Sequence, residues 1–173
     1  YPSASTAGPG SRTILCPRGR LFGGTSSING MIYMRGQPQD YDEWAALGNH
    51  GWAFADVLPY FRKSENFEAG QGPLHGQGGE LNVAAQRSPH PLSRAFVEAA
   101  LQCQFAFNSD FNGTTQSGFG LFHVTQKNGE RWSTSRAFLH PALSRPNLHV
   151  EADATVLAVA FDGRRSNGVR VQR

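Results

Sequence analysis

The feature of this sequence that most constrains its fold is a glycine-rich run, Gly23-Gly24-Thr25-Ser26-Ser27-Ile28-Asn29-Gly30. Adjacent glycines allow backbone conformations that other residues avoid, and the hydroxyl side chains that follow can cap a helix. We therefore expect a short helix that begins near Ser26. The backbone N–H groups at a helix start attract phosphate or another electron-rich group. The run matches neither the P-loop nor the dinucleotide fingerprint, so an ordinary capped turn explains it at least as well.

Glycine and proline also set the general character of the chain. Of 173 residues, 20 are Gly and 10 are Pro, whereas only 17% are charged. This length can sustain the core of one domain. The composition predicts many loops, in a structure held by packing more than by surface ion pairs. The helices and strands expected along the chain predict a mixed α and β fold, α+β. The net charge of +3 is dispersed along the chain, which is not the footprint of a nucleic-acid-binding protein.

Apolar residues at helical spacing predict helices over residues 54–63, 91–103 and 133–143. Pro59 is tolerated only in a first turn, and Pro91 suits the first position of its helix. The apolar stripe of the second helix is expected to be core: Leu92, Ala95, Phe96, Ala99, Ala100 and Cys103. The carboxylates of Asp40, Asp42 and Glu43 are interpreted as stabilising a helix start rather than as catalytic groups.

Alternating and β-branched residues predict strands over residues 119–126, 148–151, 155–161 and 168–172. Asn128-Gly129 predicts a hairpin turn, and Asp162-Gly163 and Asn167-Gly168 are expected to separate the last strands. Cys16 and Cys103 provide no disulfide framework and are expected to be reduced and buried. The sequence has no apolar run of the length of a membrane helix.

The segment from Gly19 to Gly36, GRLFGGTSSINGMIYMRG, resembles the first signature of the glucose-methanol-choline oxidoreductases. The resemblance covers the chain from Pro17 to its end, through DYDEW, GW, VLPYF, HG, DFNG and RPNL at residues 40–44, 51–52, 57–61, 75–76, 110–113 and 145–148. It implies a partial FAD-binding domain of that fold with the start of the substrate-side domain. Residues 1–88 would form the flavin-facing loop and lid, residues 89–150 the start of the substrate side, and residues 151–173 strands that return to the FAD-binding region.

The resemblance also implies the cofactor and its contacts. The loop residues Gly24, Thr25, Asn29, Gly30, Met31 and Ile32 would lie against FAD, the last four nearest the isoalloxazine. Val156 would contact the adenine through its main chain; the alternative is a buried strand valine. Some relatives attach the flavin through a histidine at the position of Ile28, so the resemblance implies noncovalent FAD here. Gln104 and Ala106 depart from the Gly and Pro that are usual in the family, which puts the turn before Asp110 in doubt.

The implied reaction is hydride transfer from the carbon of choline or another primary alcohol to flavin N5, with a quinone, another carrier or oxygen as the electron acceptor. The resemblance implies that the family's dinucleotide fingerprint would precede Tyr1, and Gly8-Pro9-Gly10 is no substitute for that fingerprint. The family's catalytic histidine would follow Arg173. No catalytic or metal-binding residue is therefore assigned. The six histidines have no metal-site spacing and are expected to have surface or satisfied polar roles.

Three interpretations follow for the chain itself. In the first, it is an internal piece of a flavin enzyme, as the missing initiator Met and signal sequence lead us to expect. In the second, it is a noncatalytic interaction module that needs further segments, with self-association or a complementing polypeptide as its partner. In the third, it is one part of a split enzyme. The family expectation for the compartment is cytoplasmic or membrane-peripheral.

Overall fold

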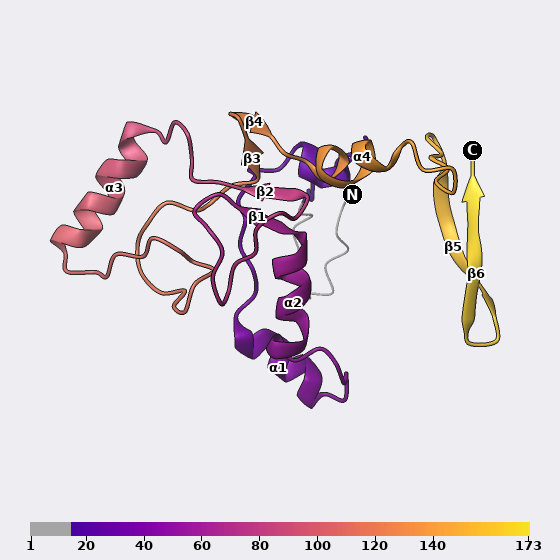
Figure 1. Cartoon of the computed structure of the whole chain (residues 1–173), viewed down its shortest axis with the longest axis horizontal. Helices are drawn as coiled ribbons and strands as arrows, with labels where there is room; N and C mark the ends of the chain where they lie inside the picture. Colours follow the sequence, from indigo (N-terminus) through magenta and orange to yellow (C-terminus); the bar gives the residue numbers. More distant parts are fainter. Residues whose placement is uncertain (1–14) are drawn as a thin grey trace, which may run out of the picture. The chain divides into compact units, whose positions relative to one another are not determined.

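The computed structural model describes residues 15–173, and the chain divides into two compact units, residues 1–141 and 142–173 (Figure 1). Each unit is described by itself. Gly8-Pro9-Gly10 falls outside the described residues.

Two helices, α1 (Pro38–Ala46) and α2 (Phe54–Ser64), pack through aromatic rings. The ring of Tyr41 lies 5.5 Å from that of Trp44, 5.9 Å from that of Phe54 and 5.7 Å from that of Phe61. Asp40 accepts a hydrogen bond from the N–H of Gln37 at the start of α1, at 2.7 Å. The helix-start role predicted for this carboxylate is confirmed.

The prediction for Pro59 is wrong, because this proline lies in the second turn of α2. A proline there removes one helical hydrogen bond. The helix nevertheless continues to Ser64, because its apolar side packs on α1 and its last turn carries Arg62 and Lys63, which favour a helix C-terminus.

Small sheets and single bridges replace a large sheet in the first unit. Strand β1 (Glu65–Phe67) pairs in parallel with β2 (Leu81–Val83). Strands β3 (Gln126–Lys127) and β4 (Glu130–Arg131) form the predicted antiparallel hairpin, with φ of 53° at Asn128 and 80° at Gly129. The strand predicted over residues 119–126 is reduced to its end in β3 and to bridges at Phe119 and Val124.

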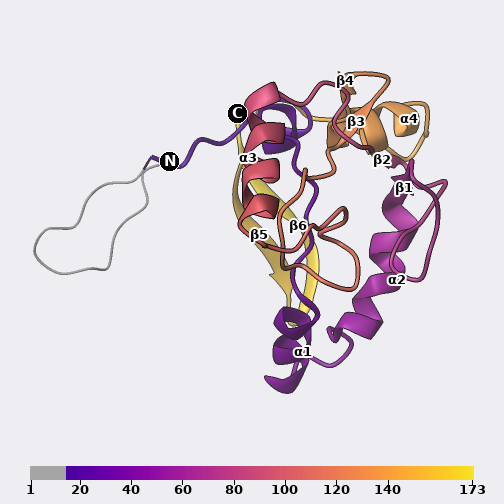
Figure 2. The same cartoon turned by 90° about the vertical axis from the view of Figure 1, so that its left-hand side faces the viewer.

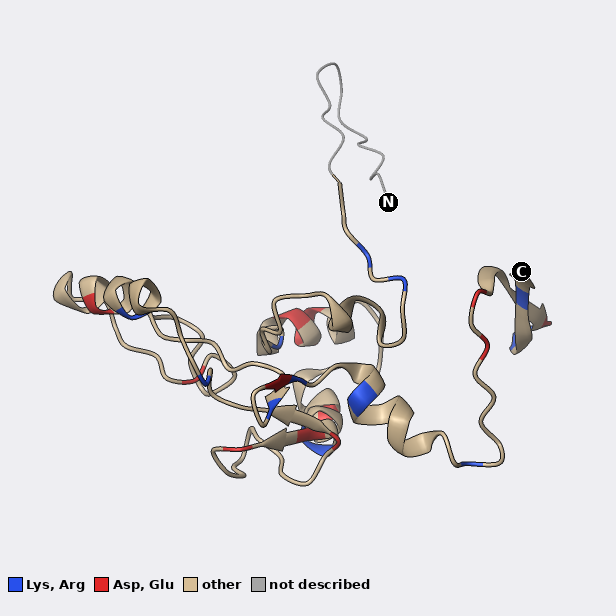
Figure 3. Ribbon diagram, turned by 90° about the horizontal axis from the view of Figure 1, so that it is seen from above, with Lys and Arg blue, Asp and Glu red and all other residues tan. Residues whose placement is uncertain are grey.

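Helix α3 (Pro91–Gln102) begins at the predicted proline, and His90 caps it by accepting the N–H of Leu92 at 3.2 Å. The expectation that its apolar stripe is core is wrong. Leu92 is 72% exposed and Phe96 67% exposed, and Ala100 is the buried residue of this helix. Figures 1, 2 and 3 show α3 apart from α1, α2 and the small sheets of its unit, so these elements do not cover its apolar side. Cys103, at the end of α3, is exposed rather than buried, and Cys16 is half-buried.

The helix predicted over residues 133–143 is present in a modified form. A π-helix, Ser135–Leu139, precedes α4 (His140–Ala142). Ser135 and Ala137 are buried, so this wider turn faces the interior of the first unit.

The second unit contains an antiparallel hairpin of β5 (Thr155–Asp162) and β6 (Arg165–Gln172). The strand predicted over residues 155–161 is confirmed. The predicted turn at Asn167-Gly168 is wrong, because an irregularity in the register absorbs one residue and β6 runs through it. Residues 148–151 form no strand.

The core of the first unit is small and partly polar. Its buried apolar residues are Phe67, Val83, Ala84, Ala100, Phe111, Val124 and Ala137. Its largest fully buried side chains are Glu65, Val83 and Asn82. In Figure 3 the charged residues are spread over helices, strands and loops. Helices and small sheets joined by long loops confirm the predicted α+β class. Within residues 15–173, no helix combines the length and the apolar character needed to cross a membrane.

Candidate functional site

The glycine-rich loop folds as a 3-10 helix over Gly24–Ser27, with Gly23 as its N-cap in the left-handed conformation at φ 86°. This helix begins two residues before the predicted start. The hydroxyls of Ser26 and Ser27 donate to the carbonyls of Gly23 (2.5 Å) and Phe22 (2.8 Å). They do not cap the N–H groups as expected, because the glycine already makes the turn into the helix.

Residues more than 100 positions later in the sequence hold this helix in place. The N–H of Thr134 donates to Ser26 Oγ at 3.0 Å, and the Thr134 hydroxyl donates to the Gly23 carbonyl at 3.2 Å. Arg131 Nη1 donates to the Ser26 carbonyl at 3.1 Å and to Asn29 Oδ1 at 3.0 Å. The loop is therefore docked on β4 and the segment that leads into the π-helix.

The second half of the loop has an unusual backbone. Met31 has a φ of 63°, a conformation that costs a non-glycine residue on the order of 1 kcal/mol. Three contacts hold it: the Met31 N–H donates to Asn29 Oδ1 at 3.0 Å, its carbonyl accepts the N–H of Thr125 at 2.8 Å, and Ile32 pairs with Val124. Strain of this kind is common where a chain approaches a ligand.

Beyond these contacts the loop has an open face. A Cβ atom built at Gly24 or Gly30 would meet no atom within 4 Å, and Ile28 and Ile32 are both about half exposed. A pocket of about 390 Å³ adjoins this face. Its lining comprises Gly30, Met31, Ile32, Gln86, Arg87, Ser88, Val124, Gln126 and Gly129.

The structure thus brings together three of the residues predicted to face the flavin, Gly30, Met31 and Ile32. Asn29 is adjacent to them and exposed, whereas Thr25 has a supporting role, since its hydroxyl accepts the N–H of Gly19 at 3.3 Å. Val156 belongs to the second unit, where it pairs with Val171 and is 56% exposed. The alternative of a buried strand valine is therefore wrong for Val156.

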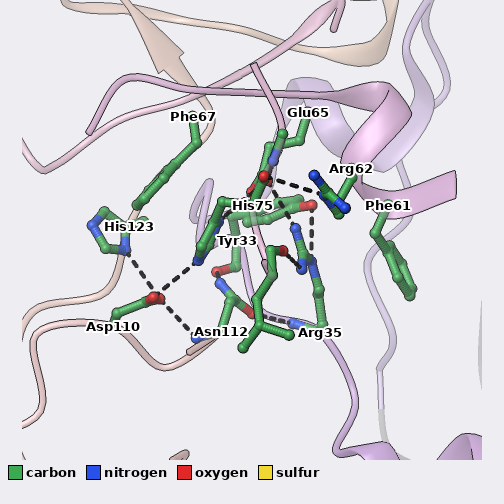
Figure 4. A network of polar contacts seen from close by, with 12 residues as sticks. Tyr33, Arg35, Phe61, Arg62, Glu65, Phe67, His75, Asp110, Asn112 and His123 are labelled. Atoms are coloured by element: carbon green, nitrogen blue, oxygen red, sulfur yellow. Dashed lines mark hydrogen bonds and ion pairs between the residues drawn. The ribbon is translucent and has the colours of Figure 1, made fainter. Parts of the chain in front are cut away.

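A buried polar cluster adjoins the end of the loop (Figure 4), and sequence reasoning did not assemble it. Arg35 is 7% exposed, and its Nη1 donates to the Leu74 carbonyl at 2.6 Å. Its Nη2 lies 2.9 Å from Glu65 Oε2, an ion pair outside the angular range of a hydrogen bond. Glu65 also accepts the N–H of Gly76 at 2.8 Å, so a fully buried carboxylate is stabilised by several donors.

Asn112 connects this cluster to the loop. Its Oδ1 accepts the N–H of Arg35 at 2.8 Å, and its Nδ2 donates to the carbonyl of Tyr33 at 3.0 Å. Tyr33 directly follows Ile32 and Arg35 lies two residues further on, so the Asn112 amide fixes the end of the glycine-rich loop. The quoted motifs contain most members of this cluster, in Gly19–Gly36, His75-Gly76 and Asp110–Gly113, but they give no sign that these residues meet.

Two titratable groups of the cluster have shifted pKa values. Burial raises the pKa of Tyr33, and the charge and hydrogen bond of Arg35 oppose that shift. Burial lowers the pKa of His123, with Asp110 opposing the shift and His75 adding to it. The satisfied polar role predicted for the histidines is confirmed for His75, which contacts Glu65 and Asp110.

Comparison with known proteins identifies the family. The family model described as GMC oxidoreductase matches residues 3–173. The chain is 45% identical over 169 residues to mitochondrial choline dehydrogenase of Mus musculus, covering 98% of the chain and 28% of that protein. It is 44% identical over 163 residues to oxygen-dependent choline dehydrogenase of Brucella anthropi, covering 94% of the chain and 30% of that protein.

Solved structures show the same relationship. Pyridoxine 4-oxidase from Mesorbium loti matches with a TM-score of 0.80 and 30% identity, over 89% of this chain and 31% of that one. An FAD-dependent oxidoreductase from Chaetomium thermophilum matches with a TM-score of 0.79 and 31% identity, over 93% of this chain and 30% of that one. The chain thus spans less than a third of the length of these relatives. It belongs to the GMC oxidoreductase family, and it corresponds to part of the FAD-binding domain of that fold.

Proposed function

We propose that the chain supplies part of the flavin site of an FAD-dependent oxidoreductase that oxidises the CH–OH group of an alcohol. The observation that carries the proposal is the open pocket lined by Gly30, Met31 and Ile32. Its lining fits a flat, largely apolar ring system with polar edges, because the absent side chain of Gly30 leaves room and Ile32 offers apolar surface. When bound, FAD would accept the hydride of the alcohol carbon at N5.

The residues of this chain would bind and orient the cofactor. Met31 and Ile32 would contact the ring through backbone and apolar atoms. Arg131 and Thr134 would keep the loop in its docked conformation, since both hold Ser26 or Gly23. We assign no proton-transfer residue within this chain.

The binding mode and the substrate are parts of the same proposal. Ile28 has no nucleophilic atom, which supports noncovalent FAD. The relatives of 44–45% identity are named choline dehydrogenases, so choline is the first alcohol to test and other primary alcohols follow. The electron acceptor is left to the same assays, with a quinone and oxygen as the candidates.

A second candidate function is that of a module that must associate with another polypeptide or with itself. The exposed Leu92 and Phe96 on α3 favour it, because soluble proteins seldom leave large apolar side chains together on one helix face. Under this alternative the chain alone would show no turnover and little affinity for FAD.

An FAD titration, followed by flavin fluorescence and protein melting, tests the proposal. Gly30→Leu should fill the pocket and weaken FAD binding at least tenfold, about 1.4 kcal/mol. Its matched control is Gly72→Leu, because a Cβ at either glycine meets no atom within 4 Å and neither has a positive φ. Saturable binding that Gly30→Leu weakens and Gly72→Leu leaves intact supports the flavin site. Absence of FAD binding by the unaltered protein would contradict the proposed flavin site.

A further inference from the structure

The buried polar cluster forms a closed ring of contacts between five residues (Figure 4). Arg35 Nη2 lies 2.9 Å from Glu65 Oε2, and Glu65 Oε1 lies 3.1 Å from His75 Nδ1. His75 Nε2 lies 2.9 Å from Asp110 Oδ2, and Asp110 Oδ1 accepts the N–H of Asn112 at 2.9 Å. Asn112 Oδ1 accepts the N–H of Arg35 at 2.8 Å, which closes the ring.

Both ring nitrogens of His75 face a carboxylate oxygen. A neutral imidazole donates through one nitrogen and presents a lone pair at the other, and an ionised carboxylate can only accept. A neutral His75 would therefore place one lone pair against Glu65 or Asp110 at hydrogen-bond distance. Protonation of both nitrogens satisfies both contacts at once.

The charges of the ring favour the same state. Glu65 is fully buried and accepts from Gly76 N in addition to facing Arg35 and His75, contacts that favour an ionised carboxylate. With His75 charged, two cations oppose two carboxylates; with His75 neutral, Arg35 alone would face both carboxylates, of which Glu65 is fully buried. The Phe67 ring stacks on the imidazole at 4.0 Å, a position that favours a cation.

The other ionisable groups around His75 are accounted for. Arg62 Nε donates to the backbone carbonyl of His75 at 3.3 Å. His123 Nδ1 lies 4.0 Å from Asp110 Oδ1, and burial lowers the pKa of His123, which disfavours a charge on this second imidazole. The Tyr33 hydroxyl accepts from Arg35 Nε at 3.4 Å. His75 is thus the group that supplies the second positive charge to the two carboxylates.

We infer that His75 is a buried imidazolium that acts as a positioning residue for the glycine-rich loop. Its Nε2 proton holds Asp110, Asp110 holds the backbone of Asn112, and the Asn112 amide fixes Tyr33 and Arg35. Met31 and Ile32 immediately precede Tyr33 in the chain, so these contacts also restrain the end of the glycine-rich loop. The consequence for FAD rests on the proposed function, whereas the charge of His75 does not.

The deciding experiment is NMR of the protein labelled with ¹⁵N in its histidines, with His75→Gln used for assignment. We expect one-bond N–H correlations from both ring nitrogens of His75 at neutral pH. A ring nitrogen without a proton overturns the inference. The protonation of the two ring nitrogens is read from the unaltered protein, so the result does not depend on whether a variant folds.

Asp110→Asn adds a second arm to this test. The oxygen of the introduced amide can still accept from Asn112 N, while the NH₂ of that amide can donate to His75 Nε2. The ring of contacts then closes around a neutral imidazole. We expect His75 to lose one ring proton in this variant. If His75 was already neutral, with the proton on Asp110, its spectrum would keep the same single ring proton, and that result would refute the inference.

The positioning role is measured by FAD affinity against pH. The pH profile of FAD affinity in Asp110→Asn should differ from that of the unaltered protein, because only the unaltered protein holds a charged His75. An unchanged pH profile in the variant contradicts the positioning role. Failure of the unaltered protein to bind FAD would contradict the proposed function alone, because the NMR result on His75 stands independently.

Discussion

Ser26 and Thr134 lie 108 positions apart in the sequence, yet the backbone N–H of Thr134 donates to the Ser26 hydroxyl oxygen at 3.0 Å. The same hydroxyl donates to the Gly23 carbonyl at 2.5 Å. One oxygen atom thus joins the start of the glycine-rich loop to the segment before the π-helix. The position of the loop depends on a long-range polar contact as well as on its own glycines.

Replacing that hydroxyl should loosen the loop. Ser26→Ala should lower the free energy of unfolding by about 1–2 kcal/mol, because Thr134 N and Gly23 O both lose a partner. Chemical denaturation measures this change. Ser27→Ala is the control, since it removes one local hydrogen bond to Phe22 and should cost less. An equal or larger loss in the control would show that the long-range contact is not what stabilises the loop.

Gln104 offers a stabilising substitution. Its φ is 65°, a left-handed conformation in which glycine has no Cβ penalty. Gln104→Gly should therefore raise the melting temperature, with a gain on the order of 1 kcal/mol. The matched control is Gln102→Gly in the last turn of α3, where glycine should lower stability by about 1 kcal/mol. Changes of the same sign in both variants would contradict this reasoning.

Gly76 lies where no side chain fits. A Cβ there would overlap the carbonyl oxygen of Arg62, a backbone atom that cannot move independently of α2. Gly76→Ala should therefore lower the free energy of unfolding by about 1–3 kcal/mol. Gly72→Ala serves as the control because a Cβ at Gly72 meets nothing within 4 Å. Equal melting temperatures for the two variants would refute the overlap.

His123 should make the protein less stable in acid. Burial lowers the pKa of His123 in the folded state below the unfolded value of about 6.5. Between these two values the unfolded state binds more protons, so the free energy of unfolding falls as the pH falls through that window. Denaturation curves at several pH values should show this fall, and His123→Gln should flatten it. His50→Gln, at an exposed position, should leave the slope unchanged.

The elements predicted well from the sequence are those with local causes. Pro91 fixed the start of α3, Asn128-Gly129 fixed the β3–β4 turn, and the alternating residues before Asp162 fixed β5. Each depends on backbone preferences of a few neighbouring residues. Of the residues that the family resemblance places against FAD, Gly30, Met31 and Ile32 line one pocket, whereas Gly24, Thr25, Asn29 and Val156 do not line it.

The failures have non-local causes. The periodicity of α3 predicted an apolar face correctly but not its exposure, because burial depends on whether another surface covers Leu92 and Phe96. The bridges of Val124 replaced a strand, since pairing partners decide whether a β-prone segment extends. The ring through His75 joins residues from position 35 to position 112, a separation that no local pattern encodes.

The amide of Asn112 presents one donor and one acceptor to the backbone, as a peptide group of an adjacent strand would. This one side chain therefore satisfies the backbone N–H of Arg35 and the carbonyl of Tyr33, as a neighbouring strand would. Aspartate would lose the donor, and glutamine would place the amide one methylene too far away. This position should consequently tolerate almost no exchange in a library of random variants, even though it does not line the pocket beside Gly30.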